Sequence, residues 1–268
     1  MRKRLVLLGG GHAHIKTLAN LKRFTGSGFE TVVVQPSRYH YYSGMGPGML
    51  GSTYEPEQIR FDTRKQVEHG GGTFIENAAV HIDPVRRSVT LADNSTISYD
   101  VVSCNTGSHV ATGRYEHGDR IIPAKPISGL IQARKTITNL INKKSAHIGV
   151  IGGGPSAVEL ACNVRQLATR HNENHVRITI FAGRRVFPGK PTRLQQMVSR
   201  YLAKREITAI EGSYVDKCEQ GSIITDQNEH YSCDLVLVAT GVAPSTLFNQ
   251  SGLTAGDGEG LAVNEYLQ

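Results

Sequence analysis

One local pattern occurs twice in this chain, and it constrains the fold more than any other feature. In each copy a short apolar run is followed by three consecutive glycines, a helical pattern and a second apolar run. The first copy spans residues 4–34 and the second spans residues 147–181. A strand, a helix and a second strand in this order form a βαβ unit with parallel strands. The repeat therefore predicts an α/β protein with two similar parallel sheets.

The glycines of the two copies point to nucleotide binding. Glycines after a buried strand let the backbone turn tightly and approach a pyrophosphate, which binds the N–H groups at the start of the following helix. The motif is Gly9-x-Gly11 in the first copy and Gly152-x-Gly154 in the second. Two such matches, each between a strand and a helix, predict two dinucleotide sites; structural tight turns are the alternative. His14 takes the third motif position of the first copy, where it is expected to loosen helix–sheet packing.

The similarity of the two copies extends beyond the glycine loops. Short alternating runs with turn residues between 72 and 94 predict a small antiparallel hairpin layer, and residues 222–226 look like a hairpin of the same kind. Apolar strands at 99–103 and 234–241 then follow, each with a Thr-Gly pair at or just after its end. We therefore expect two Rossmann-like three-layer domains, each with a hairpin layer. Glycine and proline concentrate at residues 111–129, which predicts a domain crossing there.

The residue that should bind ribose hydroxyls departs from the usual acid in both copies. The first copy has Gln35 at the end of its second strand, and an amide can still hydrogen-bond a ribose. The second copy has Arg184 and Arg185 just after its second strand. An arginine pair without an acid suits the 2′-phosphate of NADPH. NADPH and NADH both stay open, as does the alternative of solvated loop charges.

The charge distribution argues against a nucleic-acid partner. The chain has 30 Lys+Arg and 23 Asp+Glu, for a net charge of +7. The basic residues form scattered doublets rather than one stripe interleaved with aromatic residues. Solvated surface charge, attraction to anionic cofactors and attraction to an acidic membrane surface remain as interpretations.

Cysteine usage and the N-terminus bear on metal binding and location. The four cysteines are far apart, without zinc-finger spacing, and His12 and His14 lack a third ligand. We therefore expect buried reduced thiols, loop histidines and no metal site. The first apolar run stops at Gly9, whereas secretion needs about 7–15 apolar residues. No run approaches the roughly 20 apolar residues of a membrane span. We expect a cytoplasmic protein, with only peripheral contact to the inner membrane face left open.

The chain resembles the flavoproteins with two dinucleotide-binding domains, the pyridine nucleotide-disulfide oxidoreductase superfamily, in which an NAD(P)H domain interrupts an FAD domain. Within them it is most similar to the type II NADH dehydrogenase-like branch. The resemblance implies that residues 1–115 are the first part of the FAD domain and that residues 116–243 are the NAD(P)H domain. Residues 244–268 would return toward the FAD domain, whose C-terminal part is expected to be missing. The matching segments, in family order, are Leu8-Gly9-Gly10-Gly11-His12-Ala13-His14, Tyr42-Ser43-Gly44-Met45-Gly46-Pro47-Gly48, Asn105-Thr106-Gly107-Ser108, Gly152-Gly153-Gly154-Pro155-Ser156-Ala157-Val158-Glu159 and Ala239-Thr240-Gly241.

The resemblance also implies a set of FAD-binding residues. The first glycine loop would bind the pyrophosphate, Gln35 the adenosine ribose, and the backbone at Ala79 the adenine. Segment 43–48 would lie against the flavin, with Thr106 and Gly107 closing the pyrophosphate side. The full expected set is Gly9, Gly11, His12, Ala13, Gln35, Pro47, Ala79, Thr106 and Gly107.

A second set of residues is implied for NAD(P)H. Lys125 matches a family position near the flavin and is the one catalytic candidate; a role as a domain-boundary residue is the alternative. Glu159 matches the acid of the family's second helix, and complementing the helix dipole is its alternative role. The expected NAD(P)H-binding residues are Gly152, Gly154, Pro155, Ser156, Glu159, Arg184, Arg185 and Gly241.

Three functional hypotheses follow. The first is an FAD-dependent NAD(P)H oxidoreductase that passes electrons to a small acceptor, either a quinone or a soluble compound, with the flavin carrying the chemistry. The second is a truncated nucleotide-binding relative without stable FAD. The third is a relative of sulfide:quinone oxidoreductases, which would need cysteines beside the flavin, and Cys104 is the only one near enough to consider. A homodimer stays open.

Overall fold

The computed structural model describes residues 2–113, 115, 118–142, 145–171, 175–256 and 260–268. Its internal contacts divide the chain into two compact units. Unit 1 comprises Met1–His40, Arg60–Ser108 and Ala243–Gln268, and unit 2 comprises Tyr41–Ile59 and His109–Val242. Residue 116, at the expected domain boundary, lies outside the described residues. Which nucleotide each domain binds stays a prediction.

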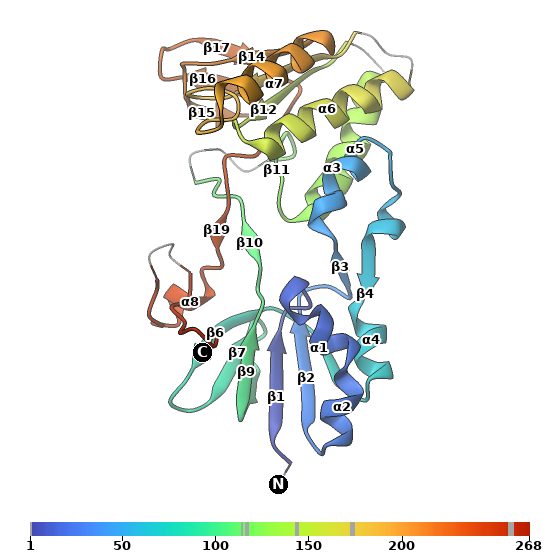
Figure 1. Ribbon diagram of the computed structural model, residues 1–268, viewed down its shortest axis with the longest axis vertical. Helices are drawn as coiled ribbons and strands as arrows, with labels where there is room; N and C mark the ends of the chain where they lie inside the picture. Colours follow the sequence, from blue (N-terminus) through green and yellow to red (C-terminus); the bar gives the residue numbers. More distant parts are fainter. Residues whose placement is uncertain (1, 114, 116–117, 143–144, 172–174, 257–259) are drawn as a thin grey trace. The chain divides into compact units, whose positions relative to one another are not determined.

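Unit 1 is built on a parallel sheet of four strands in the order β5-β2-β1-β9 (Figure 1). Side chains of β1 and β2 alternate between two apolar layers, as they must in a strand covered on both faces. Leu7 packs on one side with Leu18 and Val67, while Val6 packs on the other with Val89. The strands are β1 (Arg4–Leu8), β2 (Glu30–Gln35), β5 (Thr73–Glu76) and β9 (Val101–Cys104).

Two further layers cover this sheet. Helices supply the first, and the three-stranded antiparallel sheet β6-β7-β8 together with a short helix supplies the second. The predicted hairpin layer of the first copy is therefore confirmed for β6, β7 and β8. It is wrong for the run at 72–76, because Thr73–Glu76 pairs in parallel with β2 as the edge strand of the main sheet. The helices are η1 (His12–His14), α1 (Ile15–Ala19), α2 (Leu21–Gly26), α4 (Thr63–His69) and α8 (Leu247–Gln250), and the strands are β6 (Ala79–Asp83), β7 (Ser88–Leu91) and β8 (Thr96–Ser98).

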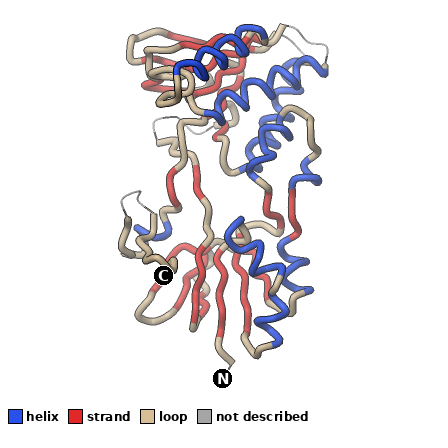
Figure 2. The backbone as a smooth tube through the Cα atoms, viewed as in Figure 1, coloured by secondary structure: helices blue, strands red, loops and turns tan. Residues whose placement is uncertain are grey.

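Unit 2 repeats the architecture with a parallel sheet of five strands in the order β11-β18-β12-β13-β14. Figure 2 shows the strands of the chain in red and its helices in blue. Its strands are β11 (Ile121–Pro123), β12 (His147–Ile151), β13 (Arg177–Phe181), β14 (Ile207–Ile210) and β18 (Leu235–Val238). Its long helices are α5 (Ile127–Ile141), α6 (Pro155–Arg170) and α7 (Thr192–Lys204), and its antiparallel sheet holds β15 (Val215–Glu219), β16 (Ser222–Thr225) and β17 (His230–Ser232). Both units are thus three-layer α/β structures, as the repeat predicts.

The residues 41–59 belong to the fold of unit 2. They contain η2 (Ser43–Met45), α3 (Gly46–Leu50) and η3 (Pro56–Ile59), and the side chain of Leu50 is fully buried in the same apolar cluster as residues of α5 and α6. Arg134 of α5 donates to the Tyr54 carbonyl at 3.2 Å and pairs with Glu55 at 3.0 Å. Gln166 of α6 donates to the Gly51 carbonyl at 3.1 Å. Hydrogen bonds and an ion pair therefore flank the buried apolar contact between residues 41–59 and the helices α5 and α6.

Short strands mark the places where the chain passes between the units. β3 (Tyr39–Tyr41) pairs with β4 (Arg60–Asp62), and β10 (Ser108–His109) pairs with β19 (Ala243–Pro244). None of the helices in the described part of the chain is long and apolar enough to cross a membrane.

Candidate functional site

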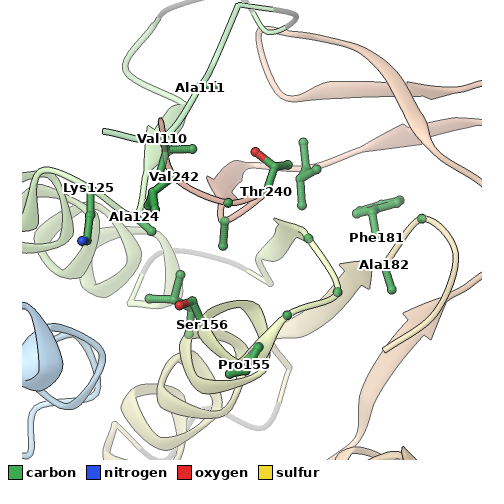
Figure 3. A pocket seen from close by; sticks show the side chains of 18 of the residues that line it. Val110, Ala111, Ala124, Lys125, Pro155, Ser156, Phe181, Ala182, Thr240 and Val242 are labelled. Carbon is green, nitrogen blue, oxygen red and sulfur yellow. The ribbon is translucent and has the colours of Figure 1, made fainter. Parts of the chain in front are cut away.

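A cavity of about 800 Å³ lies within unit 2 (Figure 3). Many of its lining residues follow the carboxyl ends of β11, β12, β13 and β18. In open parallel sheets ligands bind at this edge, where neighbouring strands connect in opposite directions. The volume lies in the range of small-molecule and cofactor sites, roughly 300–1,000 Å³. The expected site residues that line it are Pro47, Lys125, Gly152, Gly154, Pro155, Ser156 and Gly241.

The second glycine loop lines this cavity, and its first position admits only glycine. Gly152 has φ of +135°, and a Cβ on it would overlap the carbonyl oxygen of Ala239 in the neighbouring strand connection. At Gly154, by contrast, no described atom lies within 4 Å of the position that a Cβ would take. Gly154 is the N-cap of α6 and has no side chain to satisfy the first N–H groups of that helix. The loop is thus open where an anion would bind.

The rest of the lining is largely apolar. Val110, Ile127 and Leu130 contribute to its walls, and of the described lining residues Lys125 alone carries a charge. Figure 3 shows Lys125 on the strand connection beside Ala124, apart from Phe181 and Ala182 at the opposite side of the view. A mostly apolar cavity with few polar groups is typical of a cofactor site.

The expected ribose-phosphate arginines and Glu159 lie outside the lining. Arg184 and Arg185 are exposed and directly follow the lining residue Gly183. Arg185 donates to Oε1 of Gln195 in α7 at 3.0 Å. Glu159 is exposed, and α6 has no acid in its first turn, where the helix dipole acts. The cavity therefore brings together the glycine loop and Lys125, but not these three side chains.

In unit 1 the first glycine loop is closed by side chains from elsewhere in that unit. Gln35 is 6% exposed, accepts the N–H of Gly10 through Oε1 at 2.9 Å, and donates to the Ser37 carbonyl. Its amide therefore braces the loop, and its contact with a ribose stays a prediction. A Cβ at Gly9 (φ +88°) would overlap the Asn105 carbonyl oxygen, which again requires glycine.

His14 is placed differently from the sequence expectation. Its side chain is 3% exposed, with Nδ1 at 2.6 Å from the Gly9 carbonyl oxygen and Nε2 at 2.9 Å from Oγ of Ser103. The expectation of a loop side chain is wrong for His14, because the ring fills the space between the glycine loop and β9. Burial lowers the pKa of His14, partly opposed by the bond to Gly9.

Asn105 is a functional candidate that the sequence analysis did not single out. A Cβ at Gly11 would lie 2.8 Å from its Nδ2, so the amide lies across the glycine loop. That Nδ2 is buried and has no hydrogen-bond partner among the described residues. A buried donor without a partner is costly and often marks a ligand contact. Its position directly before Thr106-Gly107 was the signal available in the sequence.

The remaining expected residues of the first copy occupy varied environments. His12 and Ala13 are exposed on η1, and Gly107 is exposed with open space around it. Ala79 pairs with Leu91 at the edge of the hairpin layer. Pro47 belongs to unit 2, where it lines the cavity.

None of the cysteines in the described residues forms a disulfide, and burial makes Cys104 and Cys233 poor nucleophiles. Burial raises the pKa of Cys104 to about 11 and that of Cys233 to about 12. A thiol with such a pKa is almost fully protonated at neutral pH. Within the described ranges, no three His, Cys, Asp or Glu side chains are grouped so as to hold a metal ion.

Comparison with known proteins adds a family match over nearly the whole chain. The family model described as pyridine nucleotide-disulphide oxidoreductase matches residues 3–268. The NADH dehydrogenase-like protein YutJ of Bacillus subtilis is 24% identical over 255 residues, covering 91% of this chain and 66% of that protein. Ferroptosis suppressor protein 1 of Xenopus tropicalis is also 24% identical, covering 99% of this chain and 70% of that protein.

Solved structures agree in fold. The CoADR-RHD protein of Bacillus anthracis superposes with a TM-score of 0.83 at 19% identity, covering 100% of this chain and 49% of that one. NDH2 of Plasmodium falciparum in complex with NADH gives a TM-score of 0.78 at 17% identity, covering 93% of this chain and 57% of that one. The chain thus spans from half to two thirds of the length of several proteins it matches.

Proposed function

We propose that this chain, which belongs to the pyridine nucleotide-disulphide oxidoreductase family, carries the nicotinamide-nucleotide site and the first flavin-binding elements of an FAD-dependent NAD(P)H oxidoreductase. The observation that carries the proposal is the cavity of unit 2, with its open glycine loop at the start of a long helix. The names of similar proteins support it: one is an external alternative NAD(P)H-ubiquinone oxidoreductase of Arabidopsis thaliana, and another is the NADH-bound NDH2.

In this proposal the backbone of unit 2 binds the pyrophosphate. The N–H groups at the start of α6, beside Gly154, face the open end of the loop and attract an anion. The strand order places β13 and β18 on opposite sides of β12, so the two halves of a dinucleotide extend over these two neighbours. The apolar walls exclude water from the nicotinamide, and Lys125 is the cation placed to orient the bound nucleotide.

The two arginines after β13 favour NADPH over NADH. Ala182 stands where a ribose-binding acid is usual, and Arg184 and Arg185 follow two and three residues later. A guanidinium binds a phosphate through paired, charge-assisted hydrogen bonds. In this proposal the adenosine half of the nucleotide lies on the β13 side, and the nicotinamide half lies on the β18 side with Lys125.

The first loop of unit 1 fits an FAD pyrophosphate. A Cβ on Gly9 or Gly11 would collide with Asn105, whose Nδ2 lies across the loop and has no hydrogen-bond partner in the described part of the chain. A phosphate oxygen at this place would supply the missing acceptor. When bound, FAD supplies the hydride-accepting chemistry, so the protein itself needs to supply only binding and alignment.

The electron acceptor is proposed to be a small redox compound, with a quinone favoured by the names of the similar oxidoreductases. Peripheral contact with a membrane and a homodimer are also proposals. Flotation with lipid vesicles and sedimentation of the purified chain test them directly.

The visible absorption spectrum of the 268-residue chain tests the function. We expect flavin bands after addition of FAD and desalting, and their bleaching by NADPH or NADH without oxygen. A chain that retains no flavin but binds NADPH would instead support a nucleotide-binding protein without stable FAD. That second candidate is favoured by one observation, since all residues lining the cavity belong to unit 2.

A relationship to sulfide:quinone oxidoreductases has less support, although the enzyme of Aquifex aeolicus shares the fold with a TM-score of 0.79. Such chemistry needs a reactive thiolate, and the pKa of Cys104 is raised to about 11 by burial. Sulfide added to the FAD-loaded chain is expected to leave the flavin bands unchanged.

A further inference from the structure

Tyr214 is an exposed aromatic residue on the cavity wall to which neither the sequence motifs nor the proposed function gives a role. It follows β14 and lines the cavity, yet the residue is 56% exposed. An aromatic ring that is exposed on a cavity wall is available to contact a ligand in that cavity.

The backbone of Tyr214 is held firmly. Its N–H donates to Oδ1 of Asp226 at 2.9 Å, and its carbonyl accepts the N–H of Asp226 at 2.9 Å. Ser213 donates to the same Oδ1 at 3.0 Å. A further backbone bond of 2.6 Å joins Gly212 to the carbonyl of Gly183, which ties the loop to the end of β13. The ring is therefore presented from a fixed position.

The ring of Tyr214 packs against the backbone of Gly183. A Cβ on Gly183 would lie 2.8 Å from both Cδ1 and Cε1 of the ring, closer than real side chains approach. Glycine at this position thus allows the ring to rest on the turn after β13. Tyrosine loses little conformational freedom on binding, and its π face stacks on any planar base.

The position of Tyr214 selects one half of a dinucleotide. Gly183 follows β13, and Tyr214 follows β14, which lies next to β13 at the sheet edge away from β18. Lys125 and Val242 follow β11 and β18 on the other side of the glycine loop. Arg184, directly after Gly183, is on the Tyr214 side and favours the phosphate-bearing half of NADPH.

We propose that Tyr214 is the platform on which the adenine of the nicotinamide dinucleotide stacks. This inference rests on the proposed function, because it names a contact within the same site. It does not depend on the choice between NADPH and NADH, because both carry adenine.

The test is binding of two probes to the 268-residue chain. NADPH binding is followed by the change in its fluorescence, and calorimetry follows ADP-ribose, which has adenine and pyrophosphate but no nicotinamide. We expect Tyr214→Ala to weaken both probes about tenfold, the size of effect typical of lost base stacking. Tyr214→Phe, which keeps the aromatic face, should stay within about twofold of wild type.

Two further variants make the result decisive. Tyr214→Leu keeps apolar packing on Gly183 without a π face, and it is expected to behave like the alanine variant. Tyr201→Ala removes another exposed tyrosine of the same unit, 46% exposed on α7, and should bind both probes normally. If ADP-ribose binding is unchanged in the alanine and leucine variants, the stacking role of Tyr214 is overturned. It is also overturned if the phenylalanine variant loses binding as much as the alanine variant does. Neither result contradicts the proposed function. A wild-type chain that binds neither NADPH nor NADH overturns the proposed function, and the platform with it.

Discussion

The two glycine loops begin from the same sequence pattern but form different structures. In unit 2 the loop leads into α6, a single helix of 16 residues, and the third motif position is Ala157 with 0% exposure. In unit 1 that position is His14, and the chain forms a 3₁₀ turn followed by two short helices that meet at Asn20. A small residue lets a helix approach the sheet closely, whereas the buried imidazole of His14 occupies that space. Motif matching alone does not distinguish these outcomes.

The largest expected effect comes from adding a methyl group to either loop. Gly152→Ala would overlap the Ala239 carbonyl at φ of +135°, and such backbone strain costs about 1–3 kcal/mol before the overlap is relieved. We expect NADPH binding to fall at least about 100-fold by fluorescence titration. The matched change Gly9→Ala should reduce FAD retention and leave NADPH binding nearly unchanged. Loss of NADPH binding in both variants would contradict separate sites.

The arginine pair should give the next largest effect. Arg184→Ala with Arg185→Ala removes charge-assisted bonds to a 2′-phosphate, each worth about 1.5–3 kcal/mol. We expect the Kd for NADPH to rise about 10- to 100-fold and that for NADH to change less than about threefold. A Kd for NADPH that does not move would show that the phosphate lies elsewhere. Arg193→Ala with Arg200→Ala, on the exposed side of α7, is the charge-matched control.

Replacing His14 tests whether the imidazole holds the first loop together. His14→Ala leaves the carbonyl of Gly9 and the hydroxyl of Ser103 without their partner, so unfolding in urea should show a loss of about 1–3 kcal/mol. Ala157→Gly in the second loop, which removes only a methyl group, should cost about 1 kcal/mol. A similar stability for wild type and His14→Ala would show that the imidazole does not stabilise the first loop.

His14 also makes stability depend on pH. Its folded-state pKa lies below the ordinary value of 6.5 because burial disfavours the charged ring. As pH falls through about 6.5, His14 of the unfolded chain takes up a proton before His14 of the folded chain does. The free energy of unfolding therefore decreases between about pH 6.5 and the lower folded-state pKa. Well above pH 6.5 the ring is neutral in both states and no stability is lost to its protonation. Urea unfolding at pH 5 and pH 7.5 should show a smaller pH difference in His14→Ala. In that variant the stability still depends on pH in part, because burial also lowers the pKa of His147.

The smallest effect is expected for the ion pair between residues 41–59 and α5. Glu55→Gln breaks the 3.0 Å ion pair with Arg134, but Glu55 is 60% exposed, so the loss of stability should stay below about 1 kcal/mol. Leu50→Ala, in the buried part of the same contact, should cost about 2–5 kcal/mol. An equal cost for both changes would contradict a contact held mainly by apolar burial.

Much of the fold was accessible from sequence because it depends on local periodicity. Two βαβ units, two glycine turns and the hairpin layers all follow from patterns within about 30 residues. The cavity residues Gly152 and Gly154 were found for the same reason. The sequence did not reveal Asn105, Tyr214 or the contact of Gln35 with the glycine loop, because each of these side chains contacts a residue of another segment. The match of Tyr214 to Gly183, 31 positions earlier, is visible only once β13 and β14 lie side by side.

The placement of residues 41–59 has a consequence for how such proteins exchange parts. A recombination that moved residues 109–242 alone would carry α5 and α6 without α3. The apolar surface against which Met49 and Leu50 pack would then be exposed to solvent, and Arg134 would lose its carbonyl acceptors. Unit 2 is therefore not one continuous segment of chain that can be exchanged by itself. Its two segments must be inherited together, and a chimera designed to respect this should remain soluble where a single-segment swap aggregates.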